Sequence, residues 1–485
     1  MSKASNLKVD ERYFINPFIH SCFGEMLGTC IYDGTWVGKD SSIPNINGIR
    51  KDVIEGLKDV GIPAIRWPGG GAADHYHWQD GVGPVRRRRL ELYGQGNEFG
   101  TDEFIELCRL VNAEPILVAN VATGTPSEFA DWYEYCNGGT DTKFGALRAE
   151  YGHPEPYDVK YWGIGNTDDN VWHIAFNDPI EYARDFLKWR DALNKNQKNV
   201  KLIGLGLSER HELPGWVEKC LDYITGYQHG KAPDYLSVHH YTGGMKARYA
   251  ASEKAVEYSD AAYYFALDSV KAFQKDIDLH RQYIKEHTNI ASNTKICFDE
   301  WGLWHPEGNE ETGINQPQTL RDGLFAALSL HLFYRNSDIV EFAMETQYSN
   351  VVQSLFETKG EKFYKTPTFY AMKLLNEHLG QYLIDTDIDP ENKMTDVLMS
   401  ADKDLTKVVV SIVNKSLDNS ASVHLPECLR DYSVIDAKVI TCDDVHTQNT
   451  FEKPELIRDV EFEDYTSDKI NAPAHSVVRL VFATK

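Results

Sequence analysis

The chain has 485 residues, of which 42% are hydrophobic and 25% are charged, a composition typical of a globular protein. This length exceeds what one compact core normally holds, so we expect two domains. The formal net charge of −23 would repel a phosphate backbone or an anionic membrane, so it disfavours nucleic acid and membranes as partners. A neutral sugar polymer carries no such electrostatic penalty.

The cysteine pattern and the N-terminus bear on the cellular compartment. The eight cysteines are scattered singly and none forms a CxxC pair. The first residues, MSKASNLKVDERYF, lack the apolar core of a signal peptide, and no apolar run approaches the roughly 20 residues of a membrane span. We therefore expect free thiols and a cytoplasmic location.

From about residue 19 to 380, apolar runs alternate with amphipathic helical patterns. The strand-like runs cover residues 19–27, 64–70, 114–121, 159–166, 201–207, 235–242, 295–301 and 339–347. Helical patterns between them include residues 49–60, 101–112, 180–194 and 318–334. Such alternation predicts parallel strands with helical crossovers, and eight repeats favour a closed (β/α)₈ TIM barrel. A doubly wound open sheet is the alternative, but it usually carries a phosphate-binding glycine fingerprint near its start, which this chain lacks.

The pattern changes after a helical segment at 366–379. The segments that follow are short, rich in β-branched residues and separated by turns; they include residues 407–414, 421–425, 433–440 and 476–483. This pattern predicts an all-β sandwich, jelly-roll-like, of roughly 100 residues. We expect a catalytic barrel over residues 18–380 and a β-sandwich over 381–485, completed by residues 1–17.

Polar residues close most of the predicted barrel strands. In strand order they are Glu25, Arg66, Asn166 with Thr167, His239 with Tyr241, Asp299 with Glu300, and Gln347. Active sites of such barrels form where the strands end. Polar groups at the ends of apolar strands are costly to bury without partners, so their convergence on one rim predicts a site for a polyhydroxylated ligand.

Four motifs resemble one family of enzymes. The motifs are IRWPGG (65–70), VKYWGIGN (159–166), LSVHHY (236–241) and CFDEW (297–301). Their order and spacing resemble those of glycoside hydrolase family fifty-one. The resemblance covers nearly the whole chain. It implies a clan-A barrel that acts with retention of configuration, chiefly on terminal α-L-arabinofuranosyl groups, and it implies homo-oligomers, commonly trimers of dimers.

The resemblance assigns the nucleophile to Glu300. A retaining glycosidase needs this carboxylate to attack the anomeric carbon and form a glycosyl-enzyme. For the neighbouring Asp299, alternation along a strand predicts a structural side chain that points away from the barrel axis.

The acid/base position departs from the family. The family has Gly-Asn-Glu where this chain has Gly165-Asn166-Thr167, and a threonine hydroxyl cannot protonate a leaving group near neutral pH. Loss of a positioned acid/base typically costs roughly 10²–10⁴ in rate. Asp168 and Asp169 follow directly and are alternative acids, although Asp168 should point to the other side of the backbone. We expect an impaired enzyme.

The remaining strand-end residues match substrate-binding positions of the family. The resemblance implies that Glu25 and Arg66 contact sugar hydroxyls and that Asn166 bonds the 2-hydroxyl. His239 and Tyr241 match a pair that lines the pocket and steadies the nucleophile, and Gln347 matches a pocket-wall glutamine. Gly71 departs from the family, which has Asn or Cys there.

Several readings of the function stay open at this stage. The first is an exo-arabinofuranosidase acting on arabinose-containing oligosaccharides or polysaccharide fragments, with no metal and no cofactor. The alternatives are a related β-xylosidase or endoglucanase, which pocket shape would distinguish, and a carbohydrate-binding pseudo-enzyme whose chemistry was lost through Thr167.

Overall fold

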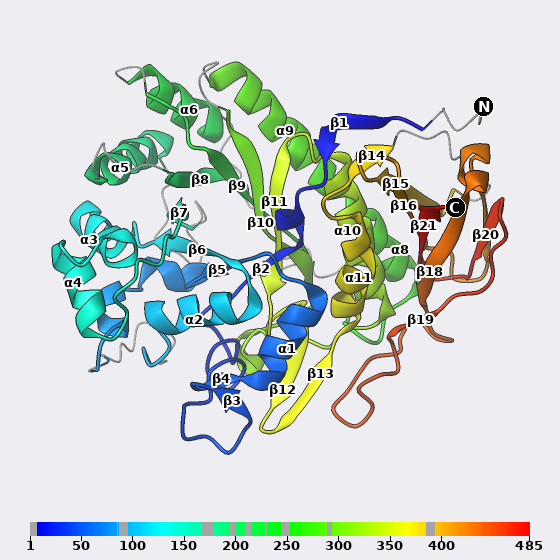
Figure 1. The fold of residues 1–485 in the computed structure, drawn as a ribbon, viewed down its shortest axis with the longest axis horizontal. Coiled ribbons are helices and arrows are strands. Elements are labelled where there is room, and N and C mark those ends of the chain that lie inside the picture. Colours follow the sequence, from blue (N-terminus) through cyan, green and yellow to red (C-terminus); the bar gives the residue numbers. More distant parts are fainter. Residues whose placement is uncertain are drawn as a thin grey trace.

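The barrel is the larger part of the fold (Figure 1). The structure is a computed structural model that describes residues 7–84, 86, 96–166, 178–193, 199–208, 215–227, 230–243, 253–288, 293–384 and 393–485. Within these residues, eight strands close into a barrel in the order β10-β11-β2-β5-β6-β7-β8-β9, and every pairing is parallel. Their bounds are β2 Ser21–Phe23, β5 Ala64–Trp67, β6 Glu114–Ala119, β7 Tyr161–Ile164, β8 Lys201–Ser208, β9 Tyr235–Gly243, β10 Lys295–Trp304 and β11 Val340–Gln347. The predicted TIM barrel is confirmed.

Helices follow the strands and cover the outside of the barrel (Figure 1). Their bounds are α1 Lys51–Val60, α2 Thr101–Val111, α3 Pro126–Asn137, α4 Lys143–Glu150, α5 Pro179–Ala192, α6 Trp216–Gly226, α8 Asp260–Asp268, α9 Lys271–His287, α10 Leu320–Arg335 and α11 Pro367–Leu375. Helix α1 shows why the sequence pattern predicts them: Val53, Leu57 and Val60 recur at helical spacing and are buried. The helix ends at Gly61, which adopts a left-handed φ of 73° and caps the last turn. Two short hairpins, β3 Asn45–Ile46 with β4 Ile49–Arg50 and β12 Phe356–Lys359 with β13 Lys362–Lys365, complete this part of the fold.

Alternate residues of the barrel strands point inward and fill its interior. One buried cluster consists of Ala64, Ile116, Ile203, Tyr235, Cys297, Phe342 and Met344. Two residues further along the same strands lie Arg66, Ser237 and Asp299, because side chains on one face of a strand recur every second residue. The apolar layer therefore supports a polar layer at the carboxyl ends of the strands.

The C-terminal part is built on one large antiparallel sheet. In the described residues it has seven strands in the order β1-β14-β15-β16-β21-β18-β19. Their bounds are β1 Val9–Phe14, β14 Tyr382–Ile384, β15 Thr395–Ala401, β16 Lys407–Asn414, β18 Tyr432–Ile440, β19 Asp459–Glu461 and β21 Ser476–Thr484. A two-stranded sheet, β17 Ala421–His424 with β20 Lys469–Ala472, contributes residues such as Val423 and Ile470 to the core on one face of the large sheet. The all-β domain is confirmed, with a second layer much smaller than the first.

The other face of the large sheet packs on barrel helices. α10 contacts β16 and β21, and α11 contacts β18 and β21; Figure 1 shows both helices between the barrel and the sheet. Strand β16 is consequently buried on both faces: Val410 faces the smaller sheet, while Ser411 contacts His331 and His378 on the barrel side. The helices thus take the place of a full second sheet. The residue at which one domain ends and the next begins stays a prediction.

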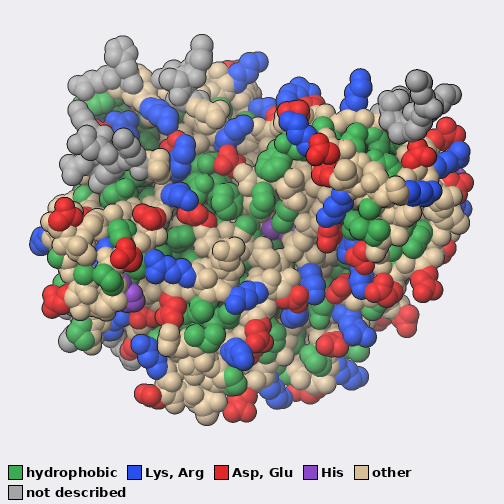
Figure 2. Space-filling view, in the orientation of Figure 1, with side chains coloured by type: hydrophobic (Ala, Val, Ile, Leu, Met, Phe, Trp, Pro, Cys, Tyr) green, Lys and Arg blue, Asp and Glu red, His purple; other side chains and the backbone are tan. Residues whose placement is uncertain are grey.

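The surface is charged but mixed in sign. On the face seen in Figure 2, acidic and basic side chains are interspersed rather than gathered into a field of one sign. Among the residues that the structure describes, no helix combines the length and apolar character needed to cross a membrane.

Candidate active site

Glu300 lies at the mouth of the barrel because β10 contains a bulge. Cys297 pairs with Ser237 and Glu300 pairs with His239, so three steps along β10 match two steps along β9. Regular alternation from the inward Cys297 already places Asp299 inside, and the additional residue brings Glu300 to the same side. The expectation that Asp299 points away from the axis is therefore wrong: it assumed that alternation runs unbroken through Glu300, whereas Asp299 lies 3.5 Å from Arg66 Nε and is almost fully buried.

Arg66 contacts two other residues of the predicted site, Glu300 and Asn166. Its Nη1 donates to Glu300 Oε1 at 3.0 Å, and its Nη2 donates to Asn166 Oδ1. Burial of the guanidinium disfavours its charge, but Asp299 and Glu300 outweigh this and raise the pKa of Arg66. Such charge-assisted contacts fix both charge and geometry at the barrel mouth.

The second oxygen of Glu300 is held from β9. The Tyr241 hydroxyl donates a hydrogen bond to Glu300 Oε2 at 3.1 Å, and His239 Nδ1 lies 3.6 Å from the same oxygen. Ser237 donates to Asp299 at 2.6 Å, and His239 Nε2 lies 3.4 Å from that carboxylate. Burial lowers the pKa of His239, yet Glu300 and Asp299 together raise it overall; in return His239 and Arg66 overcome the effect of burial and lower the pKa of Asp299.

Glu25 and Gln347 lie on the other side of Gly70 from Glu300 and contact each other. Gln347 Nε2 donates to Glu25 Oε2 at 2.6 Å, and the backbone N–H of Ala72 donates to Glu25 Oε1 at 3.1 Å. Burial, followed by repulsion from Glu300, raises the pKa of Glu25 to about 7. A methyl group added at Gly70 would lie 3.1 Å from Glu25 Oε1 and 3.2 Å from Glu300 Oε1, so this glycine lies between the two carboxyl groups.

The structure thus brings the described candidates together. One group of buried, mutually contacting residues lies at the carboxyl ends of the strands. Its members are Glu25, Arg66, Asn166, His239, Tyr241, Glu300 and Gln347. The predicted acid/base position, Thr167, and the predicted alternative acids Asp168 and Asp169 lie outside the described residues. Gly71 begins a short 3₁₀ helix, Gly71–Asp74, directly before the amide that bonds Glu25.

Two residues of this site were not among the sequence candidates. Ser237 bonds Asp299, and Trp304, half-buried, packs edge-on against Tyr241 with ring centroids 5.4 Å apart. Ser237 could have been found because it lies two residues before His239 on the same strand face. Trp304 could have been found because the apolar run that carries Glu300 continues as WGLW.

Both parts of the chain match family descriptions. Residues 56–259 match the "Alpha-L-arabinofuranosidase 1 domain", and residues 299–476 match the "Alpha-L-arabinofuranosidase C-terminal domain". The second match begins inside barrel strand β10, so it covers the end of the barrel as well as the antiparallel sheet.

Relatives and solved structures agree with these matches. The intracellular exo-α-L-arabinofuranosidase of Bacteroides ovatus is 30% identical, over 95% of this chain and 92% of its own length. Arabinofuranosidase C of Emericella nidulans is 34% identical, over 77% of this chain and 74% of its own length.

Among solved structures, the family fifty-one arabinofuranosidase of Xanthomonas axonopodis pv. citri superposes with a TM-score of 0.84 at 28% identity, covering 96% of this chain and 97% of that one. The α-L-arabinofuranosidase of Thermotoga maritima, solved as an arabinose complex, superposes with a TM-score of 0.82 at 29% identity, covering 98% of this chain and 99% of that one. With these matches along its whole length, the chain belongs to the α-L-arabinofuranosidases of glycoside hydrolase family fifty-one.

Proposed function

We propose that this protein is a retaining exo-α-L-arabinofuranosidase that releases terminal arabinofuranosyl groups from arabinose-containing oligosaccharides, with Glu300 as its nucleophile. The observation that carries the proposal is the position of Glu300. One of its oxygens accepts a hydrogen bond from Arg66 and the other accepts one from Tyr241, at the carboxyl end of a barrel strand. These contacts hold the carboxylate in one orientation before the sugar arrives, which lowers the cost of reaching the attacking geometry.

The pocket beside Glu300 is suited to sugar hydroxyls. Glu25 offers a carboxyl group and Gln347 an amide, and Gln347 Oε1 is buried without a hydrogen-bond partner among the described residues. A buried acceptor of this kind is costly unless a ligand satisfies it. We assign the binding of sugar hydroxyls to Glu25, Arg66, Asn166 and Gln347, and the orientation of the nucleophile to His239 and Tyr241.

The proposal includes a reduced rate of general acid/base catalysis. Thr167 occupies the position where the family carries its acid/base glutamate, and a hydroxyl cannot supply that proton near neutral pH. Attack by Glu300 on a substrate with a good leaving group does not need that proton. Departure of the rest of an oligosaccharide does, because its oxygen must leave as a hydroxyl group. Natural oligosaccharides should therefore react far more slowly than activated aryl glycosides.

A comparison of two substrates tests this proposal. Turnover of 2,4-dinitrophenyl α-L-arabinofuranoside is expected together with much slower turnover of arabino-oligosaccharides. Calorimetric binding of arabino-oligosaccharides without turnover of either substrate would favour the second candidate, a carbohydrate-binding pseudo-enzyme, which Thr167 supports. Turnover of xylosides in preference to arabinofuranosides would replace the proposal with a β-xylosidase.

Two further properties belong to the same proposal. We place the enzyme in the cytoplasm, supported by cysteines that are free throughout the described residues and by the name of the Bacteroides ovatus relative. We also expect a homo-oligomer, commonly a trimer of dimers in this family; light scattering that returns a monomer mass at micromolar concentration would contradict this.

A further inference from the structure

Trp304 ends β10, the strand that carries Glu300, and contacts Tyr241 of the neighbouring strand. Its ring packs edge-on against Tyr241 at an interplanar angle of 78°, and Tyr241 in turn bonds Glu300. The indole Nε1–H donates to the carbonyl of Gly308 at 2.6 Å, and the ring remains half-buried. A shift of this ring would change both the space next to Glu300 and the support of Tyr241.

Two fully buried glutamines hold the backbone on either side of Trp304. Gln316 Nε2 donates to the carbonyl of Leu303 at 3.0 Å, while Gln316 Oε1 accepts from the N–H of His305 at 2.8 Å. Gln353 Oε1 accepts from the N–H of Leu303 at 2.6 Å. Side-chain amides thus replace the neighbouring strand that would otherwise pair with these groups, since buried backbone groups need partners.

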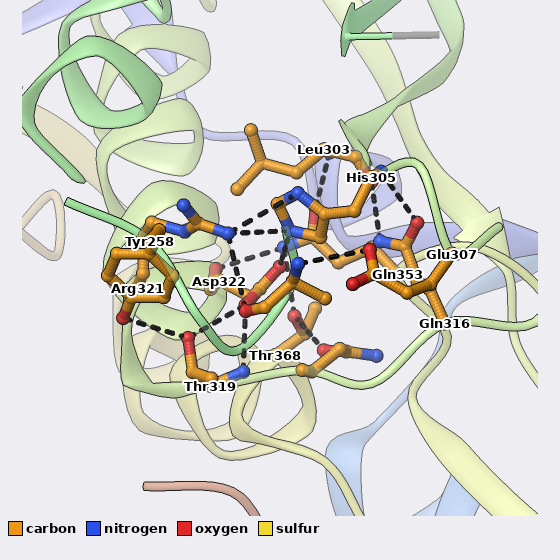
Figure 3. A network of polar contacts seen from close by, with 12 residues as sticks. Tyr258, Leu303, His305, Glu307, Gln316, Thr319, Arg321, Asp322, Gln353 and Thr368 are labelled. Carbon is orange, nitrogen blue, oxygen red and sulfur yellow. Dashed lines mark hydrogen bonds and ion pairs between the residues drawn. The ribbon is translucent and has the colours of Figure 1, made fainter. Parts of the chain in front are cut away.

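The residue after Trp304 is anchored in turn to helix α10 (Figure 3). His305 Nε2 lies 2.9 Å from Asp322 Oδ1, and Arg321 Nη2 lies 3.3 Å from His305 Nδ1. His305, Arg321 and Asp322 are all fully buried. Because the imidazole of His305 contacts both the Asp322 carboxylate and the Arg321 guanidinium, the end of β10 has little freedom to shift independently of α10.

The same network extends to the C-terminal part of the chain. The Arg321 guanidinium lies 3.7 Å from the centre of the Tyr258 ring, and the His446 ring lies 4.3 Å from Tyr258. The Tyr258 hydroxyl donates to the carbonyl of Val445 at 2.7 Å, and His446 Nε2 donates to the carbonyl of Tyr258 at 3.1 Å. A continuous series of contacts therefore runs from the loop at residues 441–449 to Trp304.

We infer that Gln316 is a positioning residue for Trp304, and that the C-terminal loop at residues 441–449 supports that position through the Tyr258 stack. The C-terminal part of the chain thereby influences sugar recognition without touching the sugar. This inference rests on the proposed function, because it takes the space beside Glu300 and Trp304 as the sugar pocket. Removal of the Gln316 amide would leave both backbone groups that flank Trp304 without partners.

A matched pair of variants separates positioning from stability. Gln316→Leu removes both bonds beside Trp304, whereas Gln381→Leu, the control, removes the bond of another buried glutamine to Ser400 of strand β15. Both variants should lower Tm. Only Gln316→Leu should raise KM and the calorimetric Kd for arabino-oligosaccharides, by about tenfold, with kcat on the dinitrophenyl substrate much less affected.

The far end of the network is tested at Tyr258. Tyr258→Leu removes the ring between Arg321 and His446 and should raise KM in the same direction, whereas Tyr258→Phe keeps the ring and should restore most of the affinity. If Tyr258→Leu leaves KM unchanged, the contribution of the C-terminal loop is refuted. If Gln316→Leu affects KM no more than Gln381→Leu, Gln316 is only a structural residue.

A measurement that does not depend on sugar separates this inference from the proposed function. Acrylamide quenching of Trp304 is obtained as the difference between each protein and its Trp304→Phe counterpart. Greater quenching of Trp304 in Gln316→Leu than in Gln381→Leu supports the positioning role even if the wild-type protein neither binds nor cleaves arabinosides, an outcome that would refute only the proposed function. Equal quenching in the two variants would overturn the inference.

Discussion

Arg66 and Glu300 meet across the mouth of the barrel, with 3.0 Å between Nη1 and Oε1, although they lie on strands that are not neighbours in the sheet. The guanidinium also lies 3.5 Å from Asp299 Oδ2, so one buried cation compensates two carboxylates that the bulge in β10 brings to the same side. Removal of one partner from such a buried cluster leaves an uncompensated charge, which costs more than the contact itself contributes.

Replacement of Arg66 by Met should therefore weaken both folding and activity. We expect the free energy of unfolding at pH 7 to fall by about 3–5 kcal/mol, measured by urea denaturation, and turnover of the aryl arabinofuranoside to be lost. Arg12→Met serves as a control, because this arginine is exposed and forms a surface ion pair with Asp10, so its replacement should leave both unchanged. An Arg66→Met variant as stable as the wild type would show that the two carboxylates are not both charged.

Replacement of Glu300 by Gln should abolish formation of the glycosyl-enzyme. The substitution keeps the shape of the side chain but removes the attacking charge. The measurement is intact-mass analysis after treatment with a mechanism-based arabinofuranosyl inhibitor, with Glu55→Gln on the exposed face of α1 as a control that should still be labelled. Labelling that persists in Glu300→Gln would assign the nucleophile to another residue.

Glu25 should make the protein less stable as the pH rises through the acidic range. Its pKa is about 7 in the folded protein against an ordinary value of 4.5, so between these values the folded state keeps a proton that the unfolded state has lost. Stability is then lost as the pH rises from 4.5 to 7, by up to about 3 kcal/mol. Urea denaturation of Glu25→Gln at several pH values should show a flatter dependence; identical slopes for the variant and the wild type would refute the raised pKa.

The histidines between the barrel and the C-terminal sheet should act in the opposite direction. Burial lowers the pKa of His20 to about 3 and that of His378 well below its ordinary value of 6.5. The unfolded chain therefore binds these protons first, and stability is lost as the pH falls below 6.5. For His20, this loss of stability between pH 6.5 and 5 should be about 2 kcal/mol.

A substitution at His378 tests this second pH effect. His378→Gln should reduce the acid dependence of unfolding. His424→Gln, at an exposed histidine on strand β17 of the two-stranded sheet, should not. The fluorescence midpoint in urea, recorded at pH 7 and pH 5, gives the comparison. A drop in the midpoint that is equally large in wild type and in His378→Gln would show that His378 does not titrate on unfolding.

We expect Thr167 to determine whether the protein is an efficient enzyme. Restoring the carboxyl group with Thr167→Glu should raise oligosaccharide turnover by roughly 10²–10⁴, because the leaving sugar needs a proton. With Thr167 in place, the glycosyl-enzyme should accumulate on the dinitrophenyl substrate, and azide, which needs no base, should release an arabinosyl azide of retained configuration. If the protein as given cleaves arabino-oligosaccharides at ordinary rates and Thr167→Glu gains nothing, Asp168, Asp169 or another acid must supply the proton.

The sequence by itself was sufficient to predict all eight barrel strands and the polar residues that close them, from Glu25 to Gln347. The reason is that both signals are local: strand and helix periodicities repeat within a few residues, and parallel strands in a barrel all end on one rim. The chemical departure at Thr167 is likewise a property of sequence alone, since it depends only on which side chain follows Asn166.

Only the tertiary structure decided how these residues act on one another. The bulge that brings Glu300 to the same side as Asp299 depends on the pairing of β10 with β9, whose residues are about 60 positions apart in the chain, so no local periodicity predicts it. The covering of the large sheet by α10 and α11, and the support of Trp304 by Gln316 and Gln353, likewise join distant segments. These arrangements follow from the need to satisfy buried backbone and side-chain groups in the closed fold, and that need has no counterpart in the extended sequence.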